Sequence, residues 1–487
     1  MKIPHRPVIF FVVGTVCCLM WAAAWATISA AQSEYEWSAP YLLSTKEGRP
    51  SEGYMVADNF GHVHVFWIET ELPDGGSVIQ HARFDGEVWT PATDIFVSRQ
   101  ITPIGFLSPF VDQQGLVHLV WSMSNFGPVC YMNAPAHDTP SAKRWSDPVC
   151  IDLPAFRGEM QVDSRGTIHL LSADFYGRPG VYYTRSEDGG NSWSPAAWLD
   201  PHIPPDHAPL DIKIAQDEAG NLHAAWHYLN LEANLGGPVY YAHSLDGGAS
   251  WSTPISIDDP DESADEVRMA RPGIVTQGQT VHIIWAGTAR TNREHRYSTD
   301  AGLSWTDSTR IFGDLHGQAA GDGLAVDGAG QIHFVSNIRH PLTIWHSYWD
   351  GDHWTDLVPA SDAFPKAHYV RLVVRAGNQL VMTFTPNSQR DALYAMYRTL
   401  SDVSVVAAQP TPVPSSESLP EAFVATDREL LGSTSTSAAL RIEDSSSQPL
   451  AGPESPSSQI WLGIAPALLL LIGIGAFQVL RKRISGH

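Results

Sequence analysis

Short apolar runs separated by polar turns recur along the middle of the chain, from about residue 33 to residue 400. Gly, Asp and Asn stand between the runs, as they do in hairpin turns that join β-strands. No stretch of this region carries apolar residues at the 3.6-residue spacing of an amphipathic helix over a useful length. The pattern therefore predicts an all-β fold.

One strand pattern returns about every 50 residues, as in "GHVHVFW" ending at Trp67 and "GNLHAAW" ending at Trp226. Its histidines are His64, His118, His169, His223, His282 and His333, and a seventh, degenerate copy without histidine ends at Phe384. Each copy follows one apolar run and precedes two more. Seven units of four strands predict a seven-bladed β-propeller. A six-bladed ring with the degenerate unit outside it is the alternative.

The seventh unit lacks a fourth strand, while the N-terminal region supplies a strand without a unit, "YEWSAPYLLS" at 35–44. We expect this strand to pair with a strand near 392–399 and to complete the last blade. Such pairing closes the ring and leaves no inner sheet edge unpaired.

Both ends of the chain differ from the propeller region. Residues 1–31 have basic residues, an apolar run and then small residues, which is typical of a signal peptide, with an uncleaved anchor as the alternative. The region 401–459 is rich in Pro, Ser and Thr and predicts a disordered stalk. Residues 460–480 carry no charge and are long enough for a transmembrane helix, and the basic tail 481–487 is then cytoplasmic. We therefore expect a single-pass protein of the cell membrane with its propeller, residues 32–400, outside.

The formal net charge of −22 argues against nucleic acid as a partner, because phosphates and this surface would repel each other. A glycan or another envelope protein is the expected partner, and no cofactor is expected. After signal removal only Cys130 and Cys150 remain, and an exported protein allows them to form one disulfide. They flank a hairpin turn of the second unit. The oligomeric state is left open.

A second motif, Ser-x-Asp-x-Gly-x-Ser-Trp or a close variant, occurs three times. Its members are Ser186, Asp188, Gly190 and Trp193; Ser244, Asp246, Gly248 and Trp251; and Ser298, Asp300, Gly302 and Trp305. The motif resembles the Asp box, the bacterial neuraminidase repeat of sialidase-like β-propellers. The resemblance implies a turn between third and fourth strands, away from the substrate pocket. We interpret these aspartates as structural: the carboxylate accepts backbone N–H bonds and the indole N–H finds an acceptor.

The same resemblance raises the possibility of a sialidase-like glycosidase. That family clamps a carboxylate with three arginines and uses a Tyr–Glu pair and an Asp. The Arg-Ile-Pro motif that normally supplies the first arginine is missing, and active members have six blades. The resemblance thus covers the repeated turn motif and does not extend to the active-site residues of the family.

Function is expected at the face opposite the Ser-x-Asp-x-Gly turns, where loops between second and third strands meet loops that enter the first strands. Candidate ligand residues from these loops are Arg157, Glu159, Asp174, Tyr176, Arg178, His227, Tyr228, Arg268, Arg271, Arg290, Arg339 and Arg371. The repeated histidines are expected to pack or hydrogen-bond between blades, with a ring of metal ligands as the alternative. The favoured function is a ligand-binding or interaction module, with carbohydrate as the expected ligand. The alternatives are a sialidase-like glycosidase and an envelope scaffold or sensor.

Overall fold

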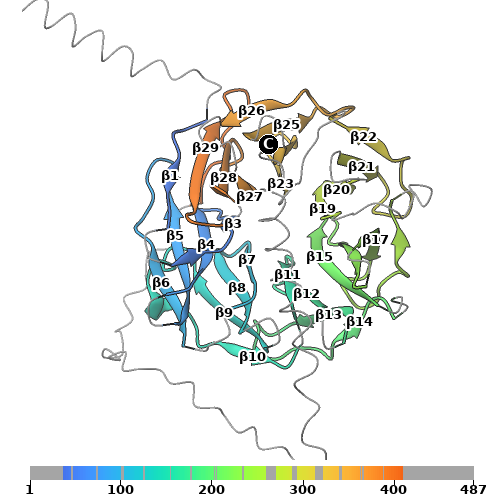
Figure 1. Ribbon diagram of the computed structural model, residues 1–487, viewed down its shortest axis with the longest axis horizontal. Helices are drawn as coiled ribbons and strands as arrows, with labels where there is room; N and C mark the ends of the chain where they lie inside the picture. Colours follow the sequence, from blue (N-terminus) through green and yellow to red (C-terminus); the bar gives the residue numbers. More distant parts are fainter. Residues whose placement is uncertain are drawn as a thin grey trace, which may run out of the picture. The chain divides into compact units, whose positions relative to one another are not determined.

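The protein is a seven-bladed β-propeller (Figure 1). The computed structural model describes residues 37–409 except 45–47, 73–74, 100–103, 124–126, 154, 176–177, 202, 204–205, 233–234, 259–269, 288–292, 313–321, 339–342, 362–363, 365–366 and 388. The expected signal peptide, transmembrane segment, cytoplasmic tail and most of the stalk lie outside these residues. Within the described part of the chain, no helix has the length and apolar character needed to cross a membrane.

Each blade is an antiparallel sheet, and in all but the last blade its four main strands follow one another in the chain. The first strands are β3 (Tyr54–Ala57), β7 (Leu107–Val111), β11 (Arg157–Val162), β15 (His207–Gln216), β19 (Gly273–Gln277), β23 (Asp322–Val326) and β27 (His368–Arg375). The second strands are β4 (Val63–Thr70), β8 (Leu116–Ser122), β12 (Ile168–Asp174), β16 (Leu222–Asn230), β20 (Thr280–Ala286), β24 (Ile332–Ile338) and β28 (Gln379–Thr385).

The outer half of each blade holds the third and fourth strands. The third strands are β5 (Ser77–Phe84), β9 (Val129–Pro135), β13 (Gly180–Ser186), β17 (Leu235–Ser244), β21 (Arg293–Ser298), β25 (Thr343–Trp349) and β29 (Tyr394–Thr399). The fourth strands are β6 (Thr93–Ser98), β10 (Val149–Ile151), β14 (Ala197–Trp198), β18 (Ile255–Ser256), β22 (Thr309–Ile311), β26 (Val358–Ser361) and β1 (Tyr41–Leu42). A short β2 (Arg49–Pro50) also pairs with β4, and η1 (Ala142–Arg144) is a single 3₁₀ turn.

The first strands line the central axis, and each contacts the first strand of the next blade, including β27 with β3 (Figure 1). The second strands are covered on both faces by neighbouring blades, which is why a strand such as "VHVFWIET" is buried along nearly its whole length. The apolar core accordingly lies between blades. One cluster joins Phe66 of β4 to Trp121 of β8, and another joins Leu171 of β12 to Trp226 of β16.

The N-terminal strand completes the last blade, as the sequence predicts. Tyr41 pairs with Ala395, and the Ser38 N–H donates to the Tyr397 carbonyl at 2.8 Å. All seven units thus belong to one ring, and the six-bladed alternative is wrong.

Residues 401–409, which the sequence assigns to the stalk, lie against the propeller. Val403 is buried, and the N–H of Gln409 donates to the carbonyl of Asn59. Asn59 stands in the turn between β3 and β4. The described chain therefore ends at the end of the ring where first strands turn into second strands.

Candidate functional site

Eight side chains at two equivalent levels of the first strands form a charged group around the central axis, which we call the axial cluster. When the blades are aligned on the repeated histidine of the second strand, the residues of one level occupy equivalent positions of the first-strand segments. The members are Glu52, Arg157, Asp211 and Arg271 at the outer level and Tyr54, Glu159, Lys213 and Arg371 one step inward. Seven of them stand in or just before the first half of their strands, and Lys213 stands just past the middle of β15, so the cluster lies at the end of the ring opposite Gln409.

Glu52 is the centre of one half of the cluster. It accepts hydrogen bonds from Arg371 Nη2 at 2.8 Å and from the Tyr54 hydroxyl at 3.0 Å. Burial acts to raise the pKa of Glu52, but the charges of Arg371 and Arg157 outweigh burial and lower that pKa to about 2. Burial and the charge of Glu52 raise the pKa of Tyr54. Glu52 is therefore ionised and Tyr54 protonated at neutral pH.

Asp211 is the centre of the other half. Its Oδ2 lies 3.7 Å from Arg271 Nε and 3.9 Å from His227 Nδ1. Burial acts to raise the pKa of Asp211, but the charge of Arg271 lowers it below its ordinary value. Burial lowers the pKa of His227, so the imidazole is neutral at pH 7.

Between these halves, Glu159 of β11 bonds to Lys213 of β15. Arg157 stands at the same point of the ring without an ion pair to any carboxylate that the structure describes. Its guanidinium carbon lies 4.2 Å from the centroid of the Phe156 ring, and Nη1 donates to the Phe156 carbonyl. The charge of Arg157 lowers the pKa values of both Glu52 and Asp211, which places it within electrostatic reach of both carboxylates.

The cluster counts four cations against three carboxylates, in a chain whose net charge is −22. Its side chains stay in contact with solvent: 23% of the Glu52 side chain is exposed and 29% of the Arg271 side chain. An anion that reaches the axis therefore meets a local excess of positive charge.

The structure brings some of the sequence-predicted residues together and separates others. Arg157, Glu159, His227, Arg271 and Arg371 meet at the axis. The remaining candidates lie elsewhere or outside the described residues: Asp174 and Arg178 bond to each other at the end of β12, Tyr228 donates to Asp200 at 2.7 Å within the core, and Tyr176, Arg268, Arg290 and Arg339 are not described.

Sequence reasoning missed Glu52, Tyr54, Asp211 and Lys213. The signal was present in the repeat. When the units are aligned on the histidine, these four residues are titratable, whereas other blades carry Phe106, Ser108 or Gly273 at the equivalent positions.

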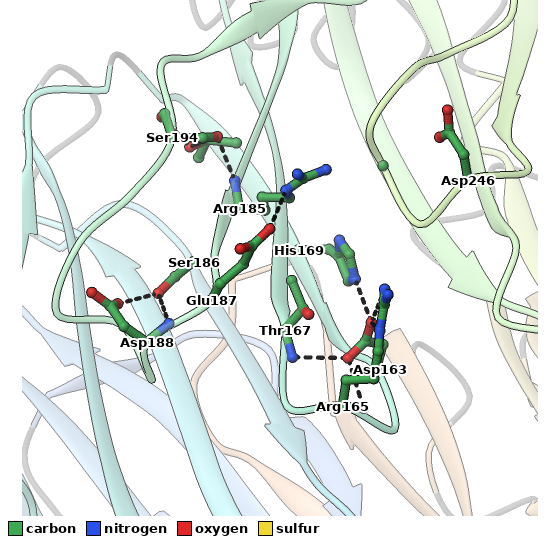
Figure 2. A network of polar contacts seen from close by, with 12 residues as sticks. Asp163, Arg165, Thr167, His169, Arg185, Ser186, Glu187, Asp188, Ser194 and Asp246 are labelled. Atoms are coloured by element: carbon green, nitrogen blue, oxygen red, sulfur yellow. Dashed lines mark hydrogen bonds and ion pairs between the residues drawn. The ribbon is translucent and has the colours of Figure 1, made fainter.

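The three Ser-x-Asp-x-Gly turns lie between third and fourth strands, at the end of the ring opposite the axial cluster. In the first turn, Asp188 Oδ1 accepts the Ser186 hydroxyl at 2.8 Å (Figure 2). The same oxygen accepts the Ser192 N–H at 2.8 Å, and the Gly190 N–H donates to Ser186 Oγ. The backbone N–H that the carboxylate accepts thus belongs to the residue four positions on. The other two turns repeat the same bonds.

Each of these turns packs on a tyrosine of the preceding blade. Gly190 lies so close that a Cβ atom there would stand 2.1 Å from Cε1 of Tyr131, and Gly248 and Gly302 face Tyr183 and Tyr241 in the same way. The indole of Trp193 donates to the Gly190 carbonyl, as expected. Within the described ranges, the indole nitrogens of Trp251 and Trp305 have no acceptor, so among these residues the expectation holds for one copy of the three.

The repeated histidines contact both their own blade and, in part as expected, the next one: His64 Nδ1 lies 3.1 Å from Thr139 Oγ1 of the second blade, and the His282 ring packs against Trp349 of the next blade. Most of their hydrogen bonds, however, lie within one blade. Each Nδ1 meets a side chain of the third strand, for example His118 with the Tyr131 hydroxyl at 2.8 Å and His282 with His295 at 3.0 Å. Five of them also face an aspartate of the turn before their strand, as His169 faces Asp163 in Figure 2. The imidazole spans three elements of one blade because the second strand lies between the turn and the third strand. Among the described residues, no group of three or more His, Cys, Asp or Glu side chains could hold a metal ion.

Cys130 and Cys150 occupy directly paired positions of β9 and β10 and form a disulfide, with their Cα atoms 4.0 Å apart.

No protein-family model matches the chain, and no curated protein matches it in sequence. Several solved structures resemble it in fold. A fungal alcohol oxidase of the AA5 family is 10% identical with a TM-score of 0.50, over 76% of this chain and 77% of that one. An ulvan lyase of polysaccharide lyase family PL25 is 13% identical with a TM-score of 0.48, over 73% and 95% of the two chains. A sialidase from Streptococcus pneumoniae is 13% identical with a TM-score of 0.42, over 75% and 72%. At these identities the likeness concerns the propeller fold alone.

Proposed function

We propose that the protein is a binding module for an anionic, carbohydrate-like ligand, which it holds at the axial cluster. The observation that carries the proposal is Arg157, a guanidinium without an ion pair among the residues described, placed where three other cations surround the axis. A planar guanidinium offers paired N–H donors that match a carboxylate or sulfate. Contact with the Phe156 ring limits its rotamers, which reduces the entropy lost on binding.

The same geometry favours binding over hydrolysis. A sialidase-like reaction would require Tyr54 to pass its proton to Glu52. The pKa of Tyr54 lies above its ordinary value and that of Glu52 below its ordinary value, so this proton transfer is unfavourable. The bonds from Arg371 keep Glu52 a weak base. Hydrolysis by this pair is therefore the second candidate.

We also propose that the three Ser-x-Asp-x-Gly turns are Asp boxes that brace the blades, and that the protein is exported and anchored by a helix over 460–480. The uncharged run over 460–480 and the basic residues that follow it support the anchor. An envelope scaffold or sensor remains the third alternative.

The test measures binding of the full-length protein, in detergent, to an array of anionic and neutral glycans. We expect anionic glycans to bind and Arg157→Gln to weaken them about 10- to 100-fold, as expected for loss of a charge-assisted hydrogen bond. Arg144→Gln, at an exposed position of the second blade, serves as the control. Equal binding by the Arg157 variant, or equal binding of neutral glycans, contradicts the proposal. Turnover of a fluorogenic sialoside that is lost in Tyr54→Phe would favour the glycosidase.

A further inference from the structure

The two acidic centres of the axial cluster differ in how well their hydrogen bonds are satisfied. Glu52 has Arg371 and Tyr54 at hydrogen-bond distance. Asp211 has Arg271 and His227 nearby, but at 3.7 and 3.9 Å neither is a hydrogen bond. The carboxylate of one half of the cluster is therefore hydrogen-bonded by its neighbours, whereas the carboxylate of the other half is not hydrogen-bonded by Arg271 or His227.

Two buried polar groups beside Asp211 have no hydrogen-bond partner among the residues that the structure describes. They are the ring nitrogens of His227 and the Nε of Arg271. His227 is fully buried, and a buried donor without an acceptor costs free energy that folding does not recover. These groups lie beside the Asp211 carboxylate, whose side chain is 27% exposed, so a bound ligand could supply the missing hydrogen bonds.

The backbone at the same place is strained. Asp211 and Arg271 adopt φ angles of 46° and 43°, in the left-handed region that non-glycine residues rarely occupy. At Asp211 this conformation coincides with a break in the pairing of β15 with β16, between Leu210 and Lys213. Local strain of this kind tends to be retained at binding and catalytic sites.

We propose that Asp211 and Arg271 form a subsite for one hydroxyl group of the ligand, and that the buried His227 positions Asp211 for it. The hydroxyl donates to the Asp211 carboxylate and accepts from Arg271 Nε–H. A hydroxyl oxygen about 2.7 Å from the carboxylate and about 2.9 Å from the nitrogen fits between two atoms that are 3.7 Å apart. His227 then needs only a small shift of Asp211 to donate Nδ1–H to it.

The subsite rests on the proposed function, because it lies beside the Arg157 site and binds another group of the same ligand. Asp211 stands on β15, next to the β11 strand of Arg157, and Gln161 of β11 donates to the Ile214 carbonyl of β15. A ligand that spans both places carries an acid group and a hydroxyl group on one ring. The protein is thus expected to prefer a hydroxylated acid to a plain acid of the same size.

The experiment compares three probes by calorimetry on the full-length protein: D-glucuronate, cyclohexanecarboxylate and glucose. We expect glucuronate to bind about tenfold more tightly than cyclohexanecarboxylate and glucose not to bind. Asp211→Ala should abolish the preference. Because the variant removes a negative charge from the axial cluster, it should bind cyclohexanecarboxylate at least as tightly as the wild type does, which also shows that the variant folds. Asp211→Asn should reduce the preference, and Glu187→Gln, an exposed acid at the opposite end, should not alter it.

His227 is tested as a positioning residue by rescue. His227→Leu should lower the preference for glucuronate without changing the affinity for cyclohexanecarboxylate, and His227→Gln, which keeps a donor, should restore most of it. If the wild-type protein binds both acids equally, or if Asp211→Ala weakens both equally, the subsite is refuted while the anion site stands. If the protein binds neither acid, the proposed function and the subsite both fail.

Discussion

Two adjacent glycines of the first Ser-x-Asp-x-Gly turn provide a test of whether these turns hold the blades together. Gly189 and Gly190 both have positive φ angles, 71° and 90°. A Cβ atom on Gly189 would meet nothing within 4 Å, whereas a Cβ atom on Gly190 would lie 2.1 Å from the ring of Tyr131 in the preceding blade. The pair therefore shares its backbone strain and differs in the contact between blades.

The expected cost follows from these two terms. An alanine at a positive φ costs about 1–2 kcal/mol in either position. Gly190→Ala adds a steric overlap that Tyr131 cannot easily relieve, because the tyrosine is buried and its hydroxyl bonds to His118 and Asn133. Overpacking of this kind costs about 1–3 kcal/mol. Gly190→Ala should therefore lower the free energy of unfolding by about 1–3 kcal/mol more than Gly189→Ala.

Urea unfolding of the two variants, followed by tryptophan fluorescence, measures the difference. A second arm places Gly190→Ala in a Tyr131→Leu background, where the smaller side chain leaves room and the extra loss should largely disappear. Equal stability of the two glycine variants would refute the reasoning, as would an extra loss that persists without the tyrosine.

Three further predictions concern stability. Burial lowers the pKa of His282 to about 4, whereas the unfolded chain binds this proton near pH 6.5, so the free energy of unfolding should fall as the pH drops through that window, by up to about 3 kcal/mol from this residue. Urea unfolding at pH 7.5 and 4.5 measures the loss, which His282→Gln should reduce; an unchanged pH dependence would contradict this. Reduction of the disulfide between Cys130 and Cys150, which are 20 positions apart, should cost about 3 kcal/mol, and a stability indifferent to reductant would argue against it. Arg293→Met should cost about 3–5 kcal/mol, because it leaves the buried Asp322, now 2.6 Å from Arg293 Nε, without its cation; adding Asp322→Leu should recover most of that loss, and a double variant no better than the single one would contradict the assignment.

The fold could be predicted from the sequence because every blade repeats the same local signals. The spacing of six histidines together with the degenerate seventh copy ending at Phe384 predicted the blade count, and the missing fourth strand of the last unit identified the partner of residues 35–44. The histidine contacts could be predicted only in part, since a side chain's direction relative to its neighbouring strands depends on packing. Contacts between blades occur, as at His64 with Thr139 and His282 with Trp349, but the bonds to the third strand, as at His118 with Tyr131, were not expected.

The candidate site was predicted in part, for a geometric reason. Arg157, Arg271 and Arg371 were found because they stand near loops that enter the first strands. Tyr228 was wrongly grouped with His227, because successive residues of a strand point to opposite faces, and its hydroxyl bonds to Asp200 in the core. Residues inside the first strands were overlooked, although the strand nearest the axis carries its own side chains toward the site.

The closure of the ring by β1 has a consequence for biosynthesis. Ser38 and Tyr397, which bond to each other, are 359 positions apart, so the first strand to emerge has no partner until the last blade has been made. The first six blades can fold while the chain is being synthesised, but β1 stays unpaired during that time. Joining segments so distant in sequence is the slow part of such a process. A chain halted before β29 would hold an open arc with a bare sheet edge, which makes a full-length product the condition for a closed ring.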